Sequence, residues 1–524
     1  MANIITRRSF MKAGAQAAVG LGLASLMNIP PFLKRALAEG SIGTNGKKLL
    51  FLFLRGGNDG VNNLIPVLDP SYYNNRALIG IPKHPQLDAL YQNTGGPGTV
   101  SFDVANPGAA ISLNNGFAGL NPAMSDLVPL YNAGDLAFLH RAGYRSLSRS
   151  HFDSEVYWEK GADGVTASNR LISDGVWYRT IVESGWNRTH ALSGVSIQSN
   201  LPQSLRGAEP MTNLSSISRY NMLGVYNNGG STNTDRVKML NAIDAANLQP
   251  YPAKDNRSLV YNLGVQFRDT LDTFQDPEFS TNEFYDTDGT THLFPVSAAT
   301  DQRGLGSGAY GIMSNIKSCA QLLARTDAVI TGTEMGGFDT HTAQVVAGAQ
   351  ATGGHANLLR RIAWTYHALW RFFSNPANNP QGRNMWNDIV LVTMSEFGRT
   401  SAENANMGTD HGESSVMYIA GGGITGGVYG CDMNPNPKLG GALNWQPGTT
   451  GKTGALFSAD TNVGYLRRTI DYRSVLGEII RDHLGATQNQ LNRIIPAYGV
   501  EGTEHLKDGG TVGTTPIIGE LGLI

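Results

Sequence analysis

Short apolar runs constrain the fold of this chain more than any other feature of its sequence. They cover residues 49–54, 136–140 and 389–394, and residues 327–333 form a further run of the same kind. Runs of this length without polar alternation are typical of strands that are buried on both faces. Helical patterns at 122–131, 356–373 and 472–484 are interspersed with them. The alternation predicts an α/β fold with a doubly wound, mostly parallel sheet flanked by helices.

Segments of different composition precede, interrupt and follow this pattern. We expect one α/β domain over residues 39–485. Polar stretches rich in Gly, Asn, Ser and Thr within about 207–308 predict an inserted cap or loop region over one sheet edge. Residues 486–524 are expected to form a C-terminal tail.

The first 38 residues have the pattern of an export signal. Thr-Arg-Arg-Ser-Phe-Met-Lys at 6–12 resembles the twin-arginine motif, an apolar stretch follows at 13–29, and Ala-Leu-Ala at 36–38 offers a cleavage site. The protein is therefore expected to pass through the twin-arginine translocation machinery and to be periplasmic or secreted. Because this route exports folded proteins, it favours a metal or cofactor that is bound before export. Later apolar runs are shorter than the roughly 20 residues that span a bilayer, so we expect no membrane span after cleavage.

The charge balance argues against nucleic acid as a partner. The chain has 40 basic and 42 acidic residues, and the first 38 residues contain five of the basic ones and none of the acidic ones. The remainder is mildly acidic and has no basic cluster that could follow a phosphate backbone. Of the two cysteines, Cys319 is predicted to be a core residue and Cys431 lies in a Gly/Asn-rich loop, so a thiolate metal site is excluded.

Polar side chains that could carry chemistry follow each apolar run, where ligands collect in open α/β sheets. The candidates are Asp59 after the first run; Ser150, His151, Asp153 and Ser154 after the second; Glu334, Asp339 and His341 after the fourth; and Glu396, Arg399, Asp410 and His411 after the run at 389–394. Carboxylates and imidazoles without thiolates suit zinc, manganese or iron, with calcium as a further possibility, and several carboxylates together can hold two cations. His355 is an alternative ligand to His341. The other interpretation is that these are ordinary turn and capping residues.

Four separated motifs give the chain a family resemblance. They are Phe-Leu-Arg-Gly-Gly-Asn-Asp-Gly at 53–60, Arg-Ser-His-Phe-Asp at 149–153, Gly-Gly-Phe-Asp-Thr-His at 336–341, and Ser-Glu-Phe-Gly-Arg-Thr with Thr-Asp-His-Gly within 395–412. Together with the export signal, they resemble the bacterial twin-arginine-exported family catalogued as domain of unknown function 1501. That family is grouped by fold with the alkaline phosphatase and sulfatase superfamily. The resemblance implies an alkaline-phosphatase-like fold and a metal-dependent hydrolase that acts on phosphate or sulfate esters, which are small anionic substrates.

The superfamily resemblance also implies roles for individual residues. Asp59 resembles the first metal-ligand Asp, Asp339 with His341 the Asp and His pair on one metal, and Glu334 a carboxylate near a further metal. Glu396 stands where the superfamily shows Asp-His, and Asp410 with His411 resembles the late His ligand. Ser150 is the preferred nucleophile, with His151 beside it and Asp153-Ser154 as the other candidate, and Arg145, Arg149 or Arg399 would hold the anion.

The chain departs from the superfamily pattern at two points, and the absent imidazole together with the uncertain nucleophile favours an alternative function. Phe397 follows Glu396, so one expected imidazole is absent, and the spacing from Asp339 to His341 is shorter than phosphatases use. The alternative is a catalytically silent relative that binds a ligand or serves in envelope assembly. A third hypothesis is a serine esterase that needs no metal.

Overall fold

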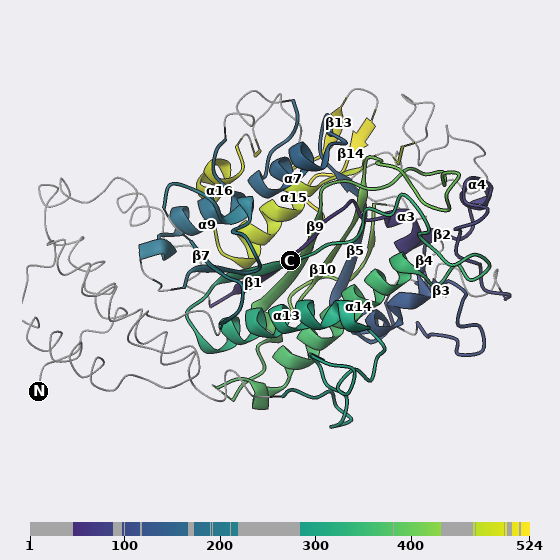
Figure 1. Cartoon of the computed structure of the whole chain (residues 1–524). Coiled ribbons are helices and arrows are strands. Elements are labelled where there is room, and N and C mark those ends of the chain that lie inside the picture. The colour runs from purple at the N-terminus through teal and green to yellow at the C-terminus, as the bar shows by residue number, and fades with distance from the viewer. Residues whose placement is uncertain are drawn as a thin grey trace, which may run out of the picture.

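The computed structural model of this chain is built around one large sheet (Figure 1). The structure describes residues 46–86, 97–98, 100–115, 118–165, 172–188, 190, 192–209, 211–217, 283–380, 382–430, 465–466, 468–496, 498–499, 506–512 and 515–524. The predicted export signal, Cys431 and residues 218–282 of the predicted inserted region lie outside these ranges.

The large sheet is mixed but largely parallel. Its strand order is β11-β5-β10-β9-β1-β8-β6-β7, with β12 paired to β5. The pairings made by β10 are antiparallel and the others are parallel. The strands are β1 (Lys48–Leu54), β5 (Leu136–Gly143), β6 (Gly194–Ile197), β7 (Thr212–Leu214), β8 (Ile330–Met335), β9 (Ile389–Ser395), β10 (Ser415–Ala420), β11 (Gly427–Tyr429) and β12 (Ile470–Asp471). The four predicted strands are confirmed as β1, β5, β8 and β9, although β8 begins three residues later than predicted.

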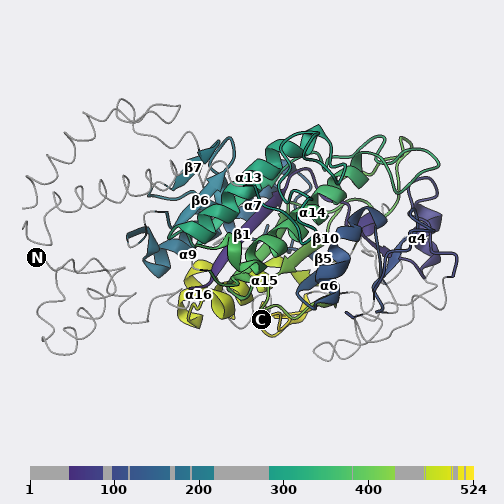
Figure 2. The same cartoon turned by 90° about the horizontal axis from the view of Figure 1, so that it is seen from below.

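Helices cover both faces of this sheet, because the side chains of the central strand alternate between two cores. Leu50, Leu52 and Leu54 of β1 pack in the same core as α13 (Ser307–Arg325) and α14 (Gly354–Ser374). Leu49, Phe51 and Phe53 belong to the core on the opposite face. The helices of that face are α7 (His151–Lys160), α9 (Val176–Ser184), α15 (Tyr472–Glu478) and α16 (Gln488–Ile494). Figures 1 and 2 show the two helical layers on either side of the strands.

Two predicted helices have a different form in the structure. Residues 122–131 were predicted as one helix, but they form the 3-10 helix η2 (Pro122–Leu127) followed by α6 (Val128–Asn132). Pro129 accounts for part of this break because it has no N–H to continue a hydrogen-bond ladder. The predicted helix at 472–484 is α15 followed by a π-helical turn, η9 (Ile479–His483). Among the described residues, no helix is both long enough and apolar enough to cross a membrane.

Smaller elements complete the described chain. They are α3 (Gly60–Asn63), α4 (Pro70–Asn75), a small sheet of β2 (Leu64–Pro66), β4 (Ala118–Leu120) and β3 (Ile111–Ser112), the 3-10 turns η3 (Trp186–Arg188), η4 (Gln203–Leu205), η6 (Pro376–Asn378) and η7 (Trp386–Asp388), and a hairpin of β13 (Gly510–Val512) and β14 (Thr515–Ile517).

The described parts of the predicted cap and tail pack onto the same domain. Of the predicted inserted region, β7 forms a sheet edge, and the buried Leu293 accepts a hydrogen bond from Trp364 of α14 through its carbonyl. Of residues 486–524, α16 packs on α9, and the buried carboxylate of Glu478 accepts the backbone N–H groups of Leu521 and Leu523. These segments therefore contribute to the core rather than stand apart from it.

We expect the stability of the protein to fall as the pH drops from about 6.5 to about 4. His483 is buried, and its Nε2 donates to the carbonyl of Lys48 at the start of β1. Burial lowers the pKa of His483 to about 4, and the bond to Lys48 opposes that shift only partly. Between these pH values the unfolded chain binds a proton that the folded protein does not, which costs roughly 3 kcal/mol of the free energy of unfolding. Denaturant unfolding at a series of pH values measures this loss.

His483→Gln should make that part of the pH profile less steep by the contribution of one proton, since an amide can donate to Lys48 but does not titrate. The buried His140 and His355, whose pKa values burial also lowers, account for a remaining slope. His292→Gln, on the loop that precedes α13, is the control and should leave the profile as it is in the parent protein. Equal slopes for the parent protein and His483→Gln would contradict the assignment.

Candidate metal centre

The carboxyl ends of three neighbouring strands meet where the sequence motifs follow them. Leu54 of β1 pairs in register with Met335 of β8 and with Ser395 of β9. The loops after these strands are thereby brought together, as predicted. Gly56 lies at their junction with φ +118°, and a Cβ there would lie 2.4 Å from the backbone nitrogen of Asp339. Position 56 of the Arg-Gly-Gly-Asn-Asp segment needs glycine, because the backbones of two segments of the chain approach so closely there.

Three histidines converge on one carboxylate oxygen at this edge. The Oδ1 atom of Asp339 lies 3.0 Å from Nε2 of His341, 3.3 Å from Nε2 of His411 and 3.6 Å from Nε2 of His151. The Nε2 atoms of His341 and His411 are 3.1 Å apart. His341 and His411 come from the loops after β8 and β9, whereas His151 comes from the first turn of α7.

The opposite ring nitrogen of each histidine is held by an acceptor. Nδ1 of His341 lies 2.8 Å from Oδ1 of Asp410, Nδ1 of His151 lies 2.8 Å from Oε1 of Glu396, and Nδ1 of His411 lies 2.8 Å from the carbonyl of Arg149. These partners place the proton on each Nδ1 and leave each Nε2 with a lone pair. Three lone pairs and a carboxylate that face one another repel unless a proton or a cation lies among them.

The donor set fits a divalent metal ion. The ligand atoms of His151, Asp339 and His411 all lie within 4.8 Å of one another, and Nε2 of His151 is buried without a hydrogen-bond partner. Imidazole nitrogens with a carboxylate favour zinc, iron or manganese, whereas calcium prefers oxygen ligands. His151, which we expected beside a nucleophile, is therefore one of the clustered donors. Phe397, which follows Glu396, packs against the rings of His151 and His411, with centroids 4.8 Å and 4.7 Å away.

A family comparison agrees with the motifs that form this centre. The sequence model of a family described as "Protein of unknown function (DUF1501)" matches residues 46–435. The chain belongs to this DUF1501 family. No curated protein matches the chain.

Asp59 of this DUF1501 protein does not join the centre. Its side chain is fully buried, and its two oxygens accept from Arg76, Nη1 to Oδ2 at 2.6 Å and Nη2 to Oδ1 at 2.9 Å. Burial alone would raise the pKa of Asp59, but the charge and hydrogen bonds of Arg76 hold the pKa below its usual value. Asp59 was predicted as a metal ligand, and the structure instead gives it a guanidinium partner. His355, the alternative ligand, is buried near this pair, and burial lowers its pKa to about 4.

Arg399 also has a different place from the predicted one. Its guanidinium is buried and donates to the carbonyls of Gly57 and Thr409 and, at 2.5 Å, to Oδ1 of Asp339. Burial raises the pKa of Asp339, but the hydrogen bond and charge of Arg399 outweigh it and lower the pKa. Arg399 therefore orients Asp339, and its guanidinium is buried rather than open to a substrate anion.

The remaining predicted residues surround the centre. Glu396 is buried and also accepts from the N–H of Gly56 at 2.6 Å. Ser154 faces the core, where its hydroxyl bonds to Tyr144 at 2.8 Å, so it is not an exposed nucleophile. Ser150 is the N-cap residue of α7, and its side chain makes no capping hydrogen bond.

Glu155 was not predicted and lies beside the centre. It is one helical turn after His151, and its carboxylate is within 4.8 Å of the ligand atoms of His151 and Glu396. Burial raises the pKa of Glu155 to about 7; the charge of Arg55 opposes this rise, and the charges of Glu396 and Glu159 add to it. The spacing of four residues from His151 on one helix face was the sequence signal that could have identified it.

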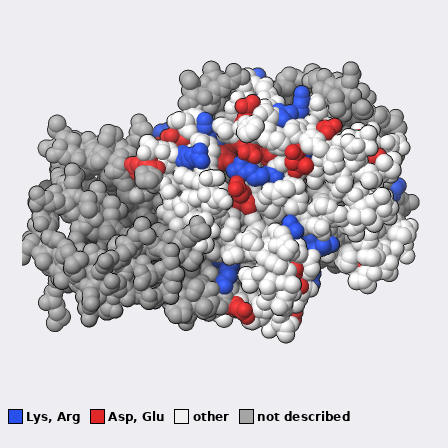
Figure 3. All heavy atoms as spheres, in the orientation of Figure 1, with Lys and Arg blue, Asp and Glu red and all other residues white. Residues whose placement is uncertain are grey.

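Acidic side chains dominate one side of the centre. Arg55 pairs with Glu155 at 2.8 Å, Glu159 at 2.7 Å and Glu334 at 2.9 Å, which leaves an excess of negative charge. Glu334, predicted near a further metal, is thus an ion-pair partner. Figure 3 shows basic and acidic side chains gathered near the middle of one face of the molecule.

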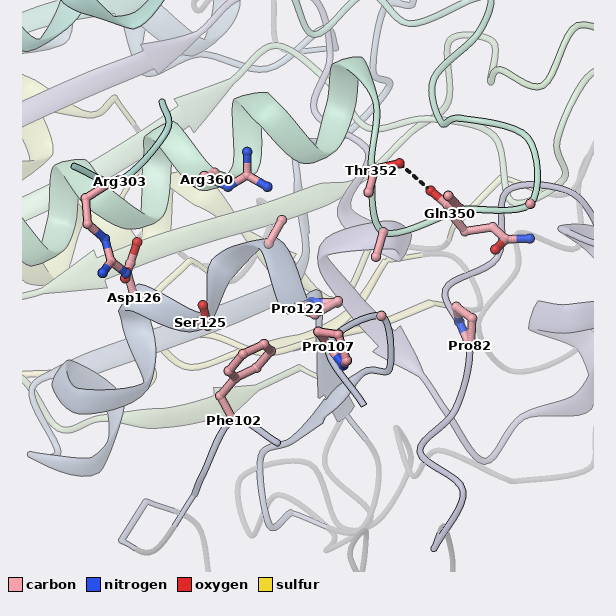
Figure 4. Close-up of a pocket in the computed structure, with 15 residues that line it drawn as sticks. Pro82, Phe102, Pro107, Pro122, Ser125, Asp126, Arg303, Gln350, Thr352 and Arg360 are labelled. Atoms are coloured by element: carbon pink, nitrogen blue, oxygen red, sulfur yellow. Dashed lines mark hydrogen bonds and ion pairs between the residues drawn. The ribbon is translucent and has the colours of Figure 1, made fainter. Parts of the chain in front are cut away.

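A separate cavity of about 530 Å³ lies between the loop of Phe102 and the residues before α14 (Figure 4). Its walls include Pro82, Pro107 and Pro122, and the ion pair of Arg303 with Asp126 lies at its edge. None of the clustered histidines and carboxylates lines it. The candidate chemistry of this DUF1501 protein is therefore at the strand ends and not in this cavity.

Asp59→Asn should destabilise the protein, because it leaves the buried charge of Arg76 without a counter-ion. Breaking one side of a buried ion pair costs about 3–5 kcal/mol. Denaturant unfolding measures this loss. Glu183→Gln, which removes a partly exposed partner of Arg493, should cost less than about 1 kcal/mol. Unchanged stability together with lost metal in Asp59→Asn would support the original ligand assignment.

Proposed function

We propose that this protein is an exported, metal-dependent hydrolase whose cation is held by His151, His341, His411 and Asp339. The convergence of three Nε2 atoms on one carboxylate oxygen carries this proposal. A divalent cation bound there would act as a Lewis acid and lower the pKa of a bound hydroxyl or water. Phosphate or sulfate esters are the proposed substrates, since the motifs resemble those of the alkaline phosphatase and sulfatase superfamily, whose fold we also propose for this sheet.

The chain's own residues orient the proposed ligands. Asp410 fixes the ring of His341, Glu396 that of His151, and the carbonyl of Arg149 that of His411. Hydrogen bonds of this kind set which ring nitrogen is free and raise its basicity. Arg399 holds Oδ1 of Asp339 in place.

Ser150 is the proposed nucleophile. It directly precedes His151 at the start of α7, and its hydroxyl makes no hydrogen bond among the described residues. The side chain of Arg149 lies over the ring of Tyr465, 4.4 Å from its centroid, and makes no salt bridge among the described residues. We therefore assign the role of anion clamp to Arg149 in place of Arg399.

The acidic side of the centre favours a second candidate function. Four carboxylates that are at least a quarter exposed, those of Glu155, Glu334, Asp339 and Asp410, oppose the approach of an anionic ester. A protein that binds a metal or a ligand without turnover, in the envelope, fits this charge better. Turnover of esters by the metal-loaded protein separates the two functions.

The mature protein should bind about one equivalent of a divalent metal per chain. His411→Ala and Asp339→Ala should each remove it, because each deletes one of four donors, whereas His84→Ala should not. His84 is the control because it also pairs with an aspartate, Asp103 at 2.8 Å, outside the centre. Elemental analysis after native export measures the stoichiometry. Metal retained in both site variants would disprove the centre.

Ser150→Ala should keep the metal and lose turnover of an aryl phosphate or sulfate by at least about 100-fold, because it deletes the nucleophilic oxygen. Steady-state kinetics with the metal-loaded variant measure this loss. Ser173→Ala, an exposed serine whose hydroxyl bonds to Asp174, is the control. Full turnover by Ser150→Ala would assign the attack to water.

A further inference from the structure

A buried glutamine links the two loops that carry the proposed ligands. Gln344 has no exposed surface and lies three residues after His341. Its Oε1 accepts from the hydroxyl of Thr340 at 2.9 Å and from the hydroxyl of Thr409 at 2.9 Å. Thr340 lies between Asp339 and His341, and Thr409 directly precedes Asp410 and His411. One carbonyl oxygen thus joins both ligand-bearing segments.

The buried ion pair of Asp59 with Arg76 sets the orientation of the Gln344 amide. Nε2 of Gln344 donates to Oδ2 of Asp59 at 2.6 Å. Because a carboxylate only accepts hydrogen bonds, the amide nitrogen must face Asp59 and the amide oxygen must face the threonines. Asp59 itself is immobilised by the two hydrogen bonds from Arg76.

Every N–H group of the Arg76 guanidinium donates a hydrogen bond. Besides Asp59, its guanidinium donates to the carbonyl of Thr400 at 2.7 Å, to that of Ser401 at 2.9 Å and to Oδ1 of Asn62 at 2.8 Å. Thr400 and Ser401 begin the loop that leads to Asp410 and His411. The positive charge beside Asp59 is therefore the guanidinium of Arg76, which also donates hydrogen bonds to the loop that carries Asp410 and His411.

The two loops approach too closely to tolerate a shift. A Cβ at Gly408 would lie 2.2 Å from the carbonyl oxygen of His341, and the N–H of Thr409 donates to the carbonyl of Thr340 at 3.0 Å. A shift of one loop against the other by a few tenths of an ångström would therefore alter the 3.1 Å distance between Nε2 of His341 and Nε2 of His411.

We propose that Gln344 is a positioning residue that sets the spacing of the two ligand-bearing loops, with Asp59 and Arg76 fixing the direction of its amide. The ligand role of these loops rests on the proposed function, but the link between them does not. Asp59 and Arg76 thus act on the centre through Gln344, without touching a metal.

Gln344→Met removes the amide at nearly constant volume and tests the link. We expect the zinc affinity to fall about 10- to 100-fold, as for other groups that orient metal ligands. In the metal-free protein, we expect faster amide hydrogen exchange at residues 338–341 and 408–411. Gln321→Met is the matched control, since Gln321 is an equally buried glutamine on α13, and it should change neither quantity.

Gln344→Glu gives a version of the same test whose result depends on pH. A carboxyl facing Asp59 shares one proton with it, so the added acid should have a raised pKa. The charged or titratable side chains that interact with Asp59 include Arg76, His355, Tyr72 and Tyr418, and of these His355 has a pKa of about 4. The protonated acid can replace the amide, so at about pH 6 loop exchange should approach that of the parent protein, and at about pH 8 it should match Gln344→Met.

The outcomes separate this inference from the proposed function. If the parent protein binds none of zinc, iron and manganese, the proposed function is wrong, and hydrogen exchange alone decides the inference. If Gln344→Met shows parent-like exchange in both segments, the inference is overturned. Should Gln344→Met fail to fold, Thr409→Val removes one of the two hydroxyls at constant shape and must give the same loosening of both segments for the inference to stand.

Discussion

The burial of β1 on both faces, between two parallel neighbours, is the constraint on which the rest of the structure depends. Six apolar side chains alternate between two cores, so helices must cover both faces of the sheet. The parallel pairing with β8 and β9 also fixes where the three following loops lie. Because β8 and β9 run parallel to β1, the loops that carry Asp339, His341 and His411 leave the sheet at the same edge.

Buried guanidinium groups hold this junction together where the backbone alone could not. Arg399 joins the loops after β1, β8 and β9 by donating to Gly57, Phe338 and Thr409. Arg76 compensates the buried charge of Asp59 and ties it to Thr400. Arginine suits both places because it offers five donors in a rigid plane and stays charged when buried. The cost of desolvating these charges is offset only because nearly every donor has an acceptor.

The centre combines imidazoles prepared for a cation with acidic surroundings. Each histidine is held at Nδ1, so the free Nε2 atoms face Asp339 without protons of their own. The same neighbourhood holds Glu155 and Glu334 around Arg55, which suits a positive charge better than a negative one. A metal ion is attracted both by the imidazole nitrogens and by the acidic side chains, whereas an anionic ester is repelled by the acidic side chains.

The sequence by itself determined β1, β5, β8 and β9, the long helix α14 and the family, because apolar runs, helical periodicity and short motifs are local properties. It also identified nearly all of the residues that gather at the strand ends. Only the tertiary structure decided what each residue does there. Asp59 and Asp339 follow strands in the same way, yet Asp59 meets Arg76, which directly follows α4, and forms an ion pair, whereas Asp339 meets three imidazoles. His151 and Glu155 join the centre because they lie on α7, which follows β5 in the chain and packs against β9. The role of a carboxylate or an imidazole depends on the charges and hydrogen-bond partners around it. These can come from a nearby segment, as Arg76 does for Asp59, or from a distant one, as Glu396 does for His151.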